Sequence, residues 1–399
     1  MGRNINTGTL TKQHILNKVS QVTIFSTYLN LSDAIVQHCI DTQELILSPI
    51  REDINPTCGF RYDNKDKLKF KDFAGYFWGD CFDLVAYVMS NMYNKEINIS
   101  NKEDFIKVLR HITFMFKDIF YGQSKDINLI TEVNATIVNL HNTKPNIELV
   151  VRDWNNLDKQ QWACDITLQD LNIEFIYPVD QYYINRNINP KPKYFYNDKD
   201  PCYGYLLGKD RSGINNIKLY FPKRDKGSTR FITNCNHLEG IYTLDRNDYN
   251  IIVITKSTKD RVAIKTTIKK MSFLYGELNT IKIGVINIPH ETYRLRQNEY
   301  DWINSKLIDG GVVISLMDND RTGKLQAIWL RDNFIITPFI IPVSYKVKDF
   351  YEWRNKLGIK HVATNIIDII INIKEYETTT IRKYYKLTGY SEESNVSPF

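Results

Sequence analysis

The chain has 399 residues, enough for two or three domains that each bury their own core. Hydrophobic residues make up 43% and charged residues 25%, a composition that indicates a soluble, folded protein. The net charge of +6 slightly favours anionic partners. No segment approaches the ~18 consecutive apolar residues of a membrane span, and the first residues lack the apolar core of a signal peptide. We therefore expect a cytoplasmic protein, in the host cytoplasm if it is viral, without a membrane partner.

The first two thirds of the chain combine helical and strand patterns. A helix is expected over 83–92, after a polar stretch rich in loop residues at 48–71. Short β-like runs follow at 173–177, 217–221 and 229–232 among many turn residues, so these regions predict an α+β fold.

From residue 248 the pattern becomes regular. Short apolar strands alternate with amphipathic helices, which is typical of a parallel sheet covered on both faces. We therefore predict an α/β domain with a parallel four-stranded sheet. The strands are expected at 249–255, 281–288, 311–317 and 335–341, and the helices at 258–271, 294–307 and 322–334.

Each predicted strand is followed by charged residues. Ligands of parallel α/β sheets gather beyond the carboxyl ends of the strands, so these side chains are expected at one edge. They are Lys256 and Asp260 after the first strand, His290 and Glu291 after the second, Asp318 and Asp320 after the third, and Lys348, Asp349 and Glu352 after the fourth.

The third of these loops is the most informative. Asp318 and Asp320 lie two residues apart where an extended strand ends, and Mg²⁺ prefers one or two such carboxylates together with substrate phosphates. Gly323 permits the tight turn into the next helix. Taken alone, the pair has an equally good structural explanation as a helix cap or a solvated turn.

Three strings in this region resemble the motifs of a Toprim domain, the metal-binding module of primases and topoisomerases. ISLMDNDRTGKLQA (314–327) resembles the strand that ends in Asp-x-Asp-x-x-Gly, and KVKDFYEW (346–353) resembles the later Lys-Asp-x-x-Asp element. IIVITKSTKDRVAI (251–264) resembles the first motif, although Lys256 stands where the family has its general-base glutamate. A lysine cannot act as that base at neutral pH unless burial lowers its pKa considerably.

The resemblance implies a role for each of these residues. Asp318 and Asp320 would hold Mg²⁺ or Mn²⁺, and Lys256 would contact a triphosphate or the template. Glu291 could supply the acidity that Lys256 lacks. The implied catalytic set is Lys256, Asp260, Asp318 and Asp320, and the implied metal ligands are Asp260, Asp318, Asp320, Asp349 and Glu352.

The segment 217–244 resembles the subdomain that precedes Toprim in bacterial and phage primases. This likeness implies that Lys218, Lys223 and Arg230, together with Lys348, contact nucleic acid or nucleotides through their phosphates. Tyr220 and Phe231 could stack on bases, but we expect such aromatic side chains to turn into the core.

The segment 47–88 resembles a primase zinc-ribbon region that has lost its ligands. Residues 48–51 and 73–76 stand where the ligands are usual, and the scattered cysteines cannot rebuild a cage of four. We predict a ribbon-like domain without zinc, with reduced thiols. The aromatic residues expected to hold it are Phe60, Tyr62, Phe70, Phe73, Tyr76, Phe77 and Trp78.

Together, the resemblance implies a phage-type DNA primase that makes short RNA primers from nucleoside triphosphates on single-stranded DNA. The chain has no Gly-rich Lys-Ser/Thr phosphate loop, so a replicative helicase would be a separate partner. A Toprim nuclease and a non-catalytic single-stranded DNA-binding replication factor stay open as alternatives. The predicted domains are a ribbon-like template-binding domain (1–125), a primase-core subdomain (126–246), a Toprim domain (247–360) and a helix with a tail (361–399).

Overall fold

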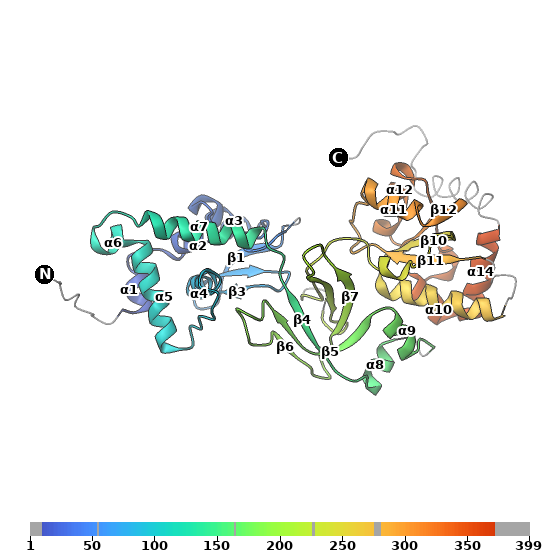
Figure 1. Ribbon diagram of the computed structural model, residues 1–399, viewed down its shortest axis with the longest axis horizontal. Coiled ribbons are helices and arrows are strands. Elements are labelled where there is room, and N and C mark those ends of the chain that lie inside the picture. Colours follow the sequence, from blue (N-terminus) through green and yellow to red (C-terminus); the bar gives the residue numbers. More distant parts are fainter. Residues whose placement is uncertain (1–9, 54–55, 163–164, 226–227, 275–280, 372–399) are drawn as a thin grey trace. The chain divides into compact units, whose positions relative to one another are not determined.

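The computed structural model describes residues 10–53, 56–162, 165–225, 228–274 and 281–371 (Figure 1). The chain divides into two compact units. The first unit comprises Met1–Arg152, Pro178–Gly204 and Arg211–Asn234, and the second comprises Asp153–Tyr177, Tyr205–Asp210 and Cys235–Phe399. The tail predicted after residue 371 lies outside the described residues, and the predicted domain boundaries stay predictions.

The first unit begins with helices around a small antiparallel sheet. The sheet has the order β1-β2-β3, and Phe60 of β1 lies opposite Phe70 of β2. Both rings are buried in one core with Phe25 and Phe82, which come from helices α2 and α4. The strands are β1 (Cys58–Tyr62), β2 (Leu68–Asp72) and β3 (Trp78–Gly79), and the helices are α1 (Lys12–Leu16), α2 (Gln21–Leu29), α3 (Asp33–Thr42), α4 (Cys81–Met92), α5 (Lys102–Met115), α6 (Lys117–Tyr121) and α7 (Ile127–His141).

The prediction that seven aromatic side chains hold this sheet is only partly correct. Phe60, Phe70 and Tyr76 are buried and Phe77 is partly buried, but Tyr62, Phe73 and Trp78 are 45%, 46% and 59% exposed. Successive residues of a strand face opposite sides, and the helices cover only one side of this sheet with apolar residues. Trp78, which lies opposite Lys71, is therefore on the other side and exposed, whereas Tyr62 lies opposite the buried Leu68 on the covered side, at the exposed end of β1.

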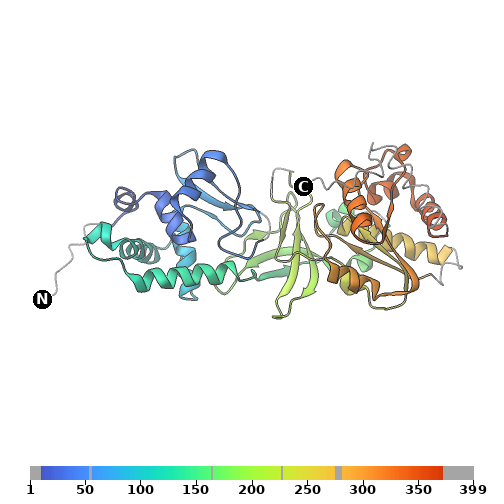
Figure 2. The ribbon, with the colours of Figure 1, turned by 90° about the horizontal axis from the view of Figure 1, so that it is seen from above.

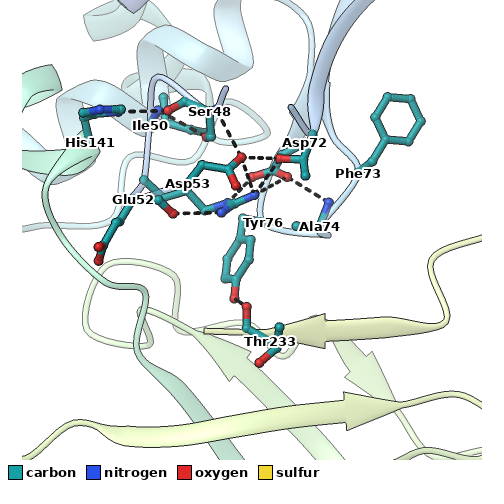
Figure 3. A network of polar contacts seen from close by, with 12 residues as sticks. Ser48, Ile50, Glu52, Asp53, Asp72, Phe73, Ala74, Tyr76, His141 and Thr233 are labelled. Atoms are coloured by element: carbon teal, nitrogen blue, oxygen red, sulfur yellow. Dashed lines mark hydrogen bonds and ion pairs between the residues drawn. The ribbon is translucent and has the colours of Figure 1, made fainter. Parts of the chain in front are cut away.

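A buried ion-pair network joins the loop at 48–53 to the end of β2 (Figure 3). The guanidinium of Arg51 donates to Asp72 at 2.7 Å from Nε and to Asp53 at 3.1 Å, and its carbon lies 4.9 Å from the ring centre of Tyr76. Arg51 and Tyr76 both stand at positions that the resemblance aligns with zinc ligands. A basic side chain and an aromatic ring thus pack together there.

The middle of the chain forms a second sheet with the strand order β4-β5-β7-β8-β9, and β6 pairs with β5. This agrees with the predicted α+β character, and the runs at 217–221 and 229–232 overlap β8 and β9. The run at 173–177 is not a single strand, because it contains the end of α9 and the start of β5. The elements are β4 (Ile147–Val151), α8 (Asn156–Gln161), α9 (Leu168–Ile173), β5 (Ile176–Ile184), β6 (Tyr194–Phe195), β7 (Tyr203–Lys209), β8 (Asn215–Tyr220) and β9 (Phe231–Thr233).

The second unit contains the predicted four-stranded sheet, which has the order β11-β10-β12-β13 with all neighbours parallel. Alternate residues of β10 face opposite sides: Ile252 packs in a core with residues of α11 and α12, and Val253 in a core with residues of α10 and α13. Helices therefore cover both faces (Figure 2). The elements are β10 (Tyr249–Thr255), α10 (Thr258–Leu274), β11 (Ile283–Asn287), α11 (Gln297–Asn304), β12 (Leu307–Leu316), α12 (Arg321–Asn333), β13 (Ile336–Phe339), α13 (Phe350–Leu357) and α14 (Ile359–Ile371).

None of the described helices is both long and apolar enough to cross a membrane.

Candidate active site

Charged side chains from four loops meet at the carboxyl edge of the parallel sheet. Lys256 follows β10, Glu291 follows β11, Asp318 follows β12, and Lys348 precedes α13. The ammonium of Lys256 pairs with both Asp318 and Glu291. The ammonium of Lys348 lies 3.2 Å from Asp318 and 3.4 Å from Asp320. The structure thus brings together five of the residues that the sequence placed at this edge.

Asp318 is the centre of this arrangement. Its side chain is 3% exposed, and lysines from two separate loops pair with one of its oxygens. Burial raises the pKa of Asp318 more strongly than the two ammoniums lower it. Burial alone would lower the pKa of Lys256, but its hydrogen bonds to Asp318 and Glu291 outweigh burial and raise that pKa. Lys256 therefore stays charged at neutral pH and cannot serve as a general base.

Asp320 combines a structural and an electrostatic contact. Its Oδ1 accepts a hydrogen bond of 2.9 Å from the backbone N–H of Gly323, so it caps α12 as the structural explanation predicted. Its Oδ2 faces Lys348. Burial raises the pKa of Asp320, but the Gly323 N–H and the charge of Lys348 outweigh it and lower that pKa.

Gly323 is required by close approach rather than by a special turn. A Cβ at this position would lie 2.2 Å from the carbonyl oxygen of Asp318 and 2.8 Å from its nitrogen. Only glycine lets the first turn of α12 pack directly against the backbone that carries this carboxylate.

The other three predicted acidic ligands each accept a hydrogen bond from a backbone N–H. Asp260 is buried and accepts from Ser257 Oγ at 2.6 Å and from the backbone N–H of Tyr351 at 3.0 Å. Burial, and then the charge of Asp349, raises the pKa of Asp260 to about 7. Asp349 caps α13, and Glu352 accepts from the backbone N–H of Lys348 at 2.7 Å. These contacts fix the loop of Lys348, and the predicted set of five metal ligands stays a prediction.

Two residues at the edge, Asp318 and Asp320, can serve as ligands of a divalent cation. Within the part of the chain that the structure describes, no three His, Cys, Asp or Glu side chains are grouped as a metal site. Asp318 and Asp320 nevertheless offer hard oxygen donors, and the ammoniums of Lys256 and Lys348 show that positive charge is stabilised there. Two carboxylates suit Mg²⁺ when substrate phosphates supply further ligands.

A buried acid that the sequence did not single out also lies at this edge. Glu239 is 1% exposed, and its Oε2 accepts from Thr258 Oγ1 at 2.8 Å and from Asn287 Nδ2 at 2.9 Å. It thereby joins the start of α10 to the end of β11. No local pattern marks Glu239, because its partners lie 19 and 48 residues away.

Three of the four predicted nucleic-acid contacts, Lys218, Lys223 and Arg230, lie on the β8–β9 hairpin of the first unit, and the fourth, Lys348, lies at the sheet edge. The rings of Tyr220 and Phe231 stack with centres 4.9 Å apart, the ammonium of Lys218 lies 5.1 Å from the Phe231 ring, and Arg230 donates to the Tyr220 hydroxyl at 3.4 Å. Phe231 is 47% exposed, so the expectation that it turns into the core is wrong. Lys223 instead donates to the carbonyl of Asp198.

Comparisons with known proteins give little further information. No protein-family model matches the chain, and no curated protein matches it. One similar solved chain comes from a structure of the bacteriophage T7 lagging-strand DNA polymerase interacting with primase domains of two gp4 subunits bound to an RNA/DNA hybrid and dTTP. It is 13% identical, with 56% of this chain and 98% of that chain covered and a TM-score of 0.36. A flavohemoglobin from Malassezia yamatoensis with bound FAD and heme is 10% identical, with coverages of 66% and 80% and a TM-score of 0.13. TM-scores this low do not establish a shared fold with either.

Proposed function

We propose that this chain is a phage-type DNA primase that synthesises short RNA primers on single-stranded DNA. The observation that supports this best is the meeting of Lys256, Asp318 and Lys348 at the carboxyl edge of a parallel sheet, where α/β proteins bind their ligands. The order of the three Toprim-like motifs along this sheet also agrees with the proposal.

Within this proposal the residues of the edge have separate tasks. Lys256 and Lys348 orient the triphosphate as point charges, and Asp318 and Asp320 hold Mg²⁺ or Mn²⁺. The ion, when bound, would lower the pKa of the attacking 3′-hydroxyl and neutralise charge that develops on the phosphate. Asp260 holds the loop of Lys348 in place, because it accepts a hydrogen bond from the backbone N–H of Tyr351, which follows that loop.

The β8–β9 hairpin is proposed to bind the template or the incoming nucleotide. Lys218 and Arg230 would neutralise phosphates, and the stacked Tyr220–Phe231 pair presents an exposed ring on which a base can stack. Lys223 would add a further phosphate contact at the end of the hairpin. A replicative helicase would be supplied by a separate chain.

The proposal is tested by incubating the full chain with single-stranded DNA, labelled ribonucleotides and Mg²⁺ or Mn²⁺. We expect metal-dependent product ladders that disappear in the Asp318→Asn/Asp320→Asn protein. The control is Asp332→Asn, because Asp332 is exposed on α12 and pairs with Arg331 rather than with the edge. Shortened DNA in place of ladders would indicate the nuclease alternative.

A second candidate function is binding of single-stranded DNA without catalysis. It is favoured by the position of Lys256, which pairs with Asp318 instead of providing a base, and by a cationic aromatic surface on the small sheet. There the ammonium of Lys71 lies 4.6 Å from the exposed ring of Phe73 and 5.8 Å from that of Trp78. Retarded DNA in a gel shift, with no product under any metal, would select this function over priming.

A further inference from the structure

The ammonium of Lys256 lies between two carboxylates at the sheet edge. One is the buried Asp318, and the other is Glu291, whose side chain is 43% exposed. The side chain of Lys256 is itself only 20% exposed, whereas that of Lys348 is 52% exposed. Lys256 is therefore the cation that is most enclosed by this acidic edge.

We propose that Lys256 holds the cation position of the site until a nucleoside triphosphate binds. Its ammonium then moves to a phosphate group and leaves Asp318 to a divalent ion. The inference rests on the proposed function, since it concerns the same site. A lysine ammonium is a compact charge on a flexible stem, and it binds phosphate oxygens as well as carboxylate oxygens.

The backbone around the site makes such a movement local. The N–H of Asn319 donates to the carbonyl of Lys348 at 2.6 Å, and the N–H of Lys348 donates to Glu352 at 2.7 Å. Asp320 is held by the N–H of Gly323. The loops that carry the carboxylates are thus tied to one another and to helix ends, so only the lysine side chains need to rearrange.

A divalent ion at Asp318 would be repelled by the ammonium of Lys256, which already pairs with Oδ2 of that carboxylate, so Lys256 and the ion compete for it. When a ligand binds only a minor state of the protein, its apparent affinity is reduced in proportion to the fraction of molecules in that state. If Asp318 is free of Lys256 in about one molecule in ten, the affinity for the ion is about tenfold weaker than the carboxylates alone would give. A triphosphate that draws Lys256 away removes this competition, so nucleotide and ion bind cooperatively.

Replacing Lys256 should therefore change two affinities in opposite directions. Mn²⁺ binding to the full chain without nucleotide is measured by electron paramagnetic resonance, and binding of a fluorescent ATP analogue is measured in EDTA. For Lys256→Met we expect Mn²⁺ to bind about tenfold more tightly and the ATP analogue about tenfold more weakly than in the wild type. Lys256→Gln is the second variant, because its amide can still donate to Asp318 if the methionine variant does not fold.

Two further variants serve as controls. Lys256→Arg keeps the charge, so Mn²⁺ should bind as weakly as in the wild type. Lys269→Met removes a lysine of α10, the helix that follows Lys256. The ammonium of Lys269 pairs with Asp170 at 2.9 Å, away from the edge, so this variant should change neither affinity.

The outcomes separate this inference from the proposed function. Unchanged or weaker Mn²⁺ binding in both uncharged variants would overturn the inference, because Lys256 would then be a structural partner of Asp318 only. Opposite shifts in the two affinities support it. If the shifts appear and no primers are ever made, the exchange of cations stands while the proposal of a primase fails.

Discussion

Replacing Arg51 should destabilise the first unit strongly, because its guanidinium pairs with two buried carboxylates, Asp72 and Asp53. Arg51 is 7% exposed, and the side chains of its partners Asp72 and Asp53 are 0% and 6% exposed. Arg51→Met would leave two buried carboxylates without this counter-charge.

The size of the loss in stability depends on the hydrogen bonds that the two carboxylates keep when Arg51 is replaced. Removing one partner of a buried ion pair costs about 3–5 kcal/mol. Asp72 keeps a hydrogen bond of 2.8 Å from the N–H of Ala74, and Asp53 keeps one of 3.2 Å from the N–H of Ser48. We therefore expect the lower end, a loss of about 3 kcal/mol in the free energy of unfolding. Asp72→Asn in the same chain should recover part of this loss, with a coupling of about 2 kcal/mol.

The assay is urea unfolding of the wild type, both single variants and the double variant, followed by circular dichroism. The matched control is Arg186→Met, whose arginine is 49% exposed and lies 3.8 Å from Glu148, so its loss should stay within about 1 kcal/mol. If Arg51→Met costs no more than Arg186→Met, the network does not stabilise the fold and our reasoning about residues 48–76 is wrong.

Three other predictions concern pH, packing and binding. Burial lowers the pKa of His111 from 6.5 to about 4, so between these values only the unfolded chain binds the proton and stability falls as the pH falls. In His111→Gln we expect the drop in the free energy of unfolding between about pH 7 and about pH 4.5 to be about 2 kcal/mol smaller than in the wild type. The measurement compares the urea midpoints of both proteins at the two pH values, and an equal pH dependence would argue against the prediction. Gly323→Ala should abolish Mn²⁺ binding and lower the melting temperature, because its Cβ meets the Asp318 backbone, and wild-type values for both would contradict the close approach. Phe231→Ala should weaken single-stranded DNA binding by about 1–3 kcal/mol in a fluorescence titration, whereas exposed Phe195→Ala should not.

The sequence by itself determined the layout of the second unit. Alternating apolar strands and helices are local patterns, so β10 was predicted with its observed ends, and the parallel sheet is confirmed. Because parallel strands end at one edge, the neighbourhood of Lys256, Glu291, Asp318 and Lys348 also followed from the order of elements.

Only the tertiary structure decided which charges pair and which rings are exposed. Asp260 turns to the backbone of Tyr351, 91 residues away, although its loop position suggested the metal edge. Arg51 likewise pairs with Asp72, a residue from a different segment of the chain. Trp78 faces solvent because helices cover just one side of its sheet with apolar residues. Periodicity fixes which face a residue occupies, but the partner of a buried charge is fixed by desolvation and distance among segments far apart in the chain.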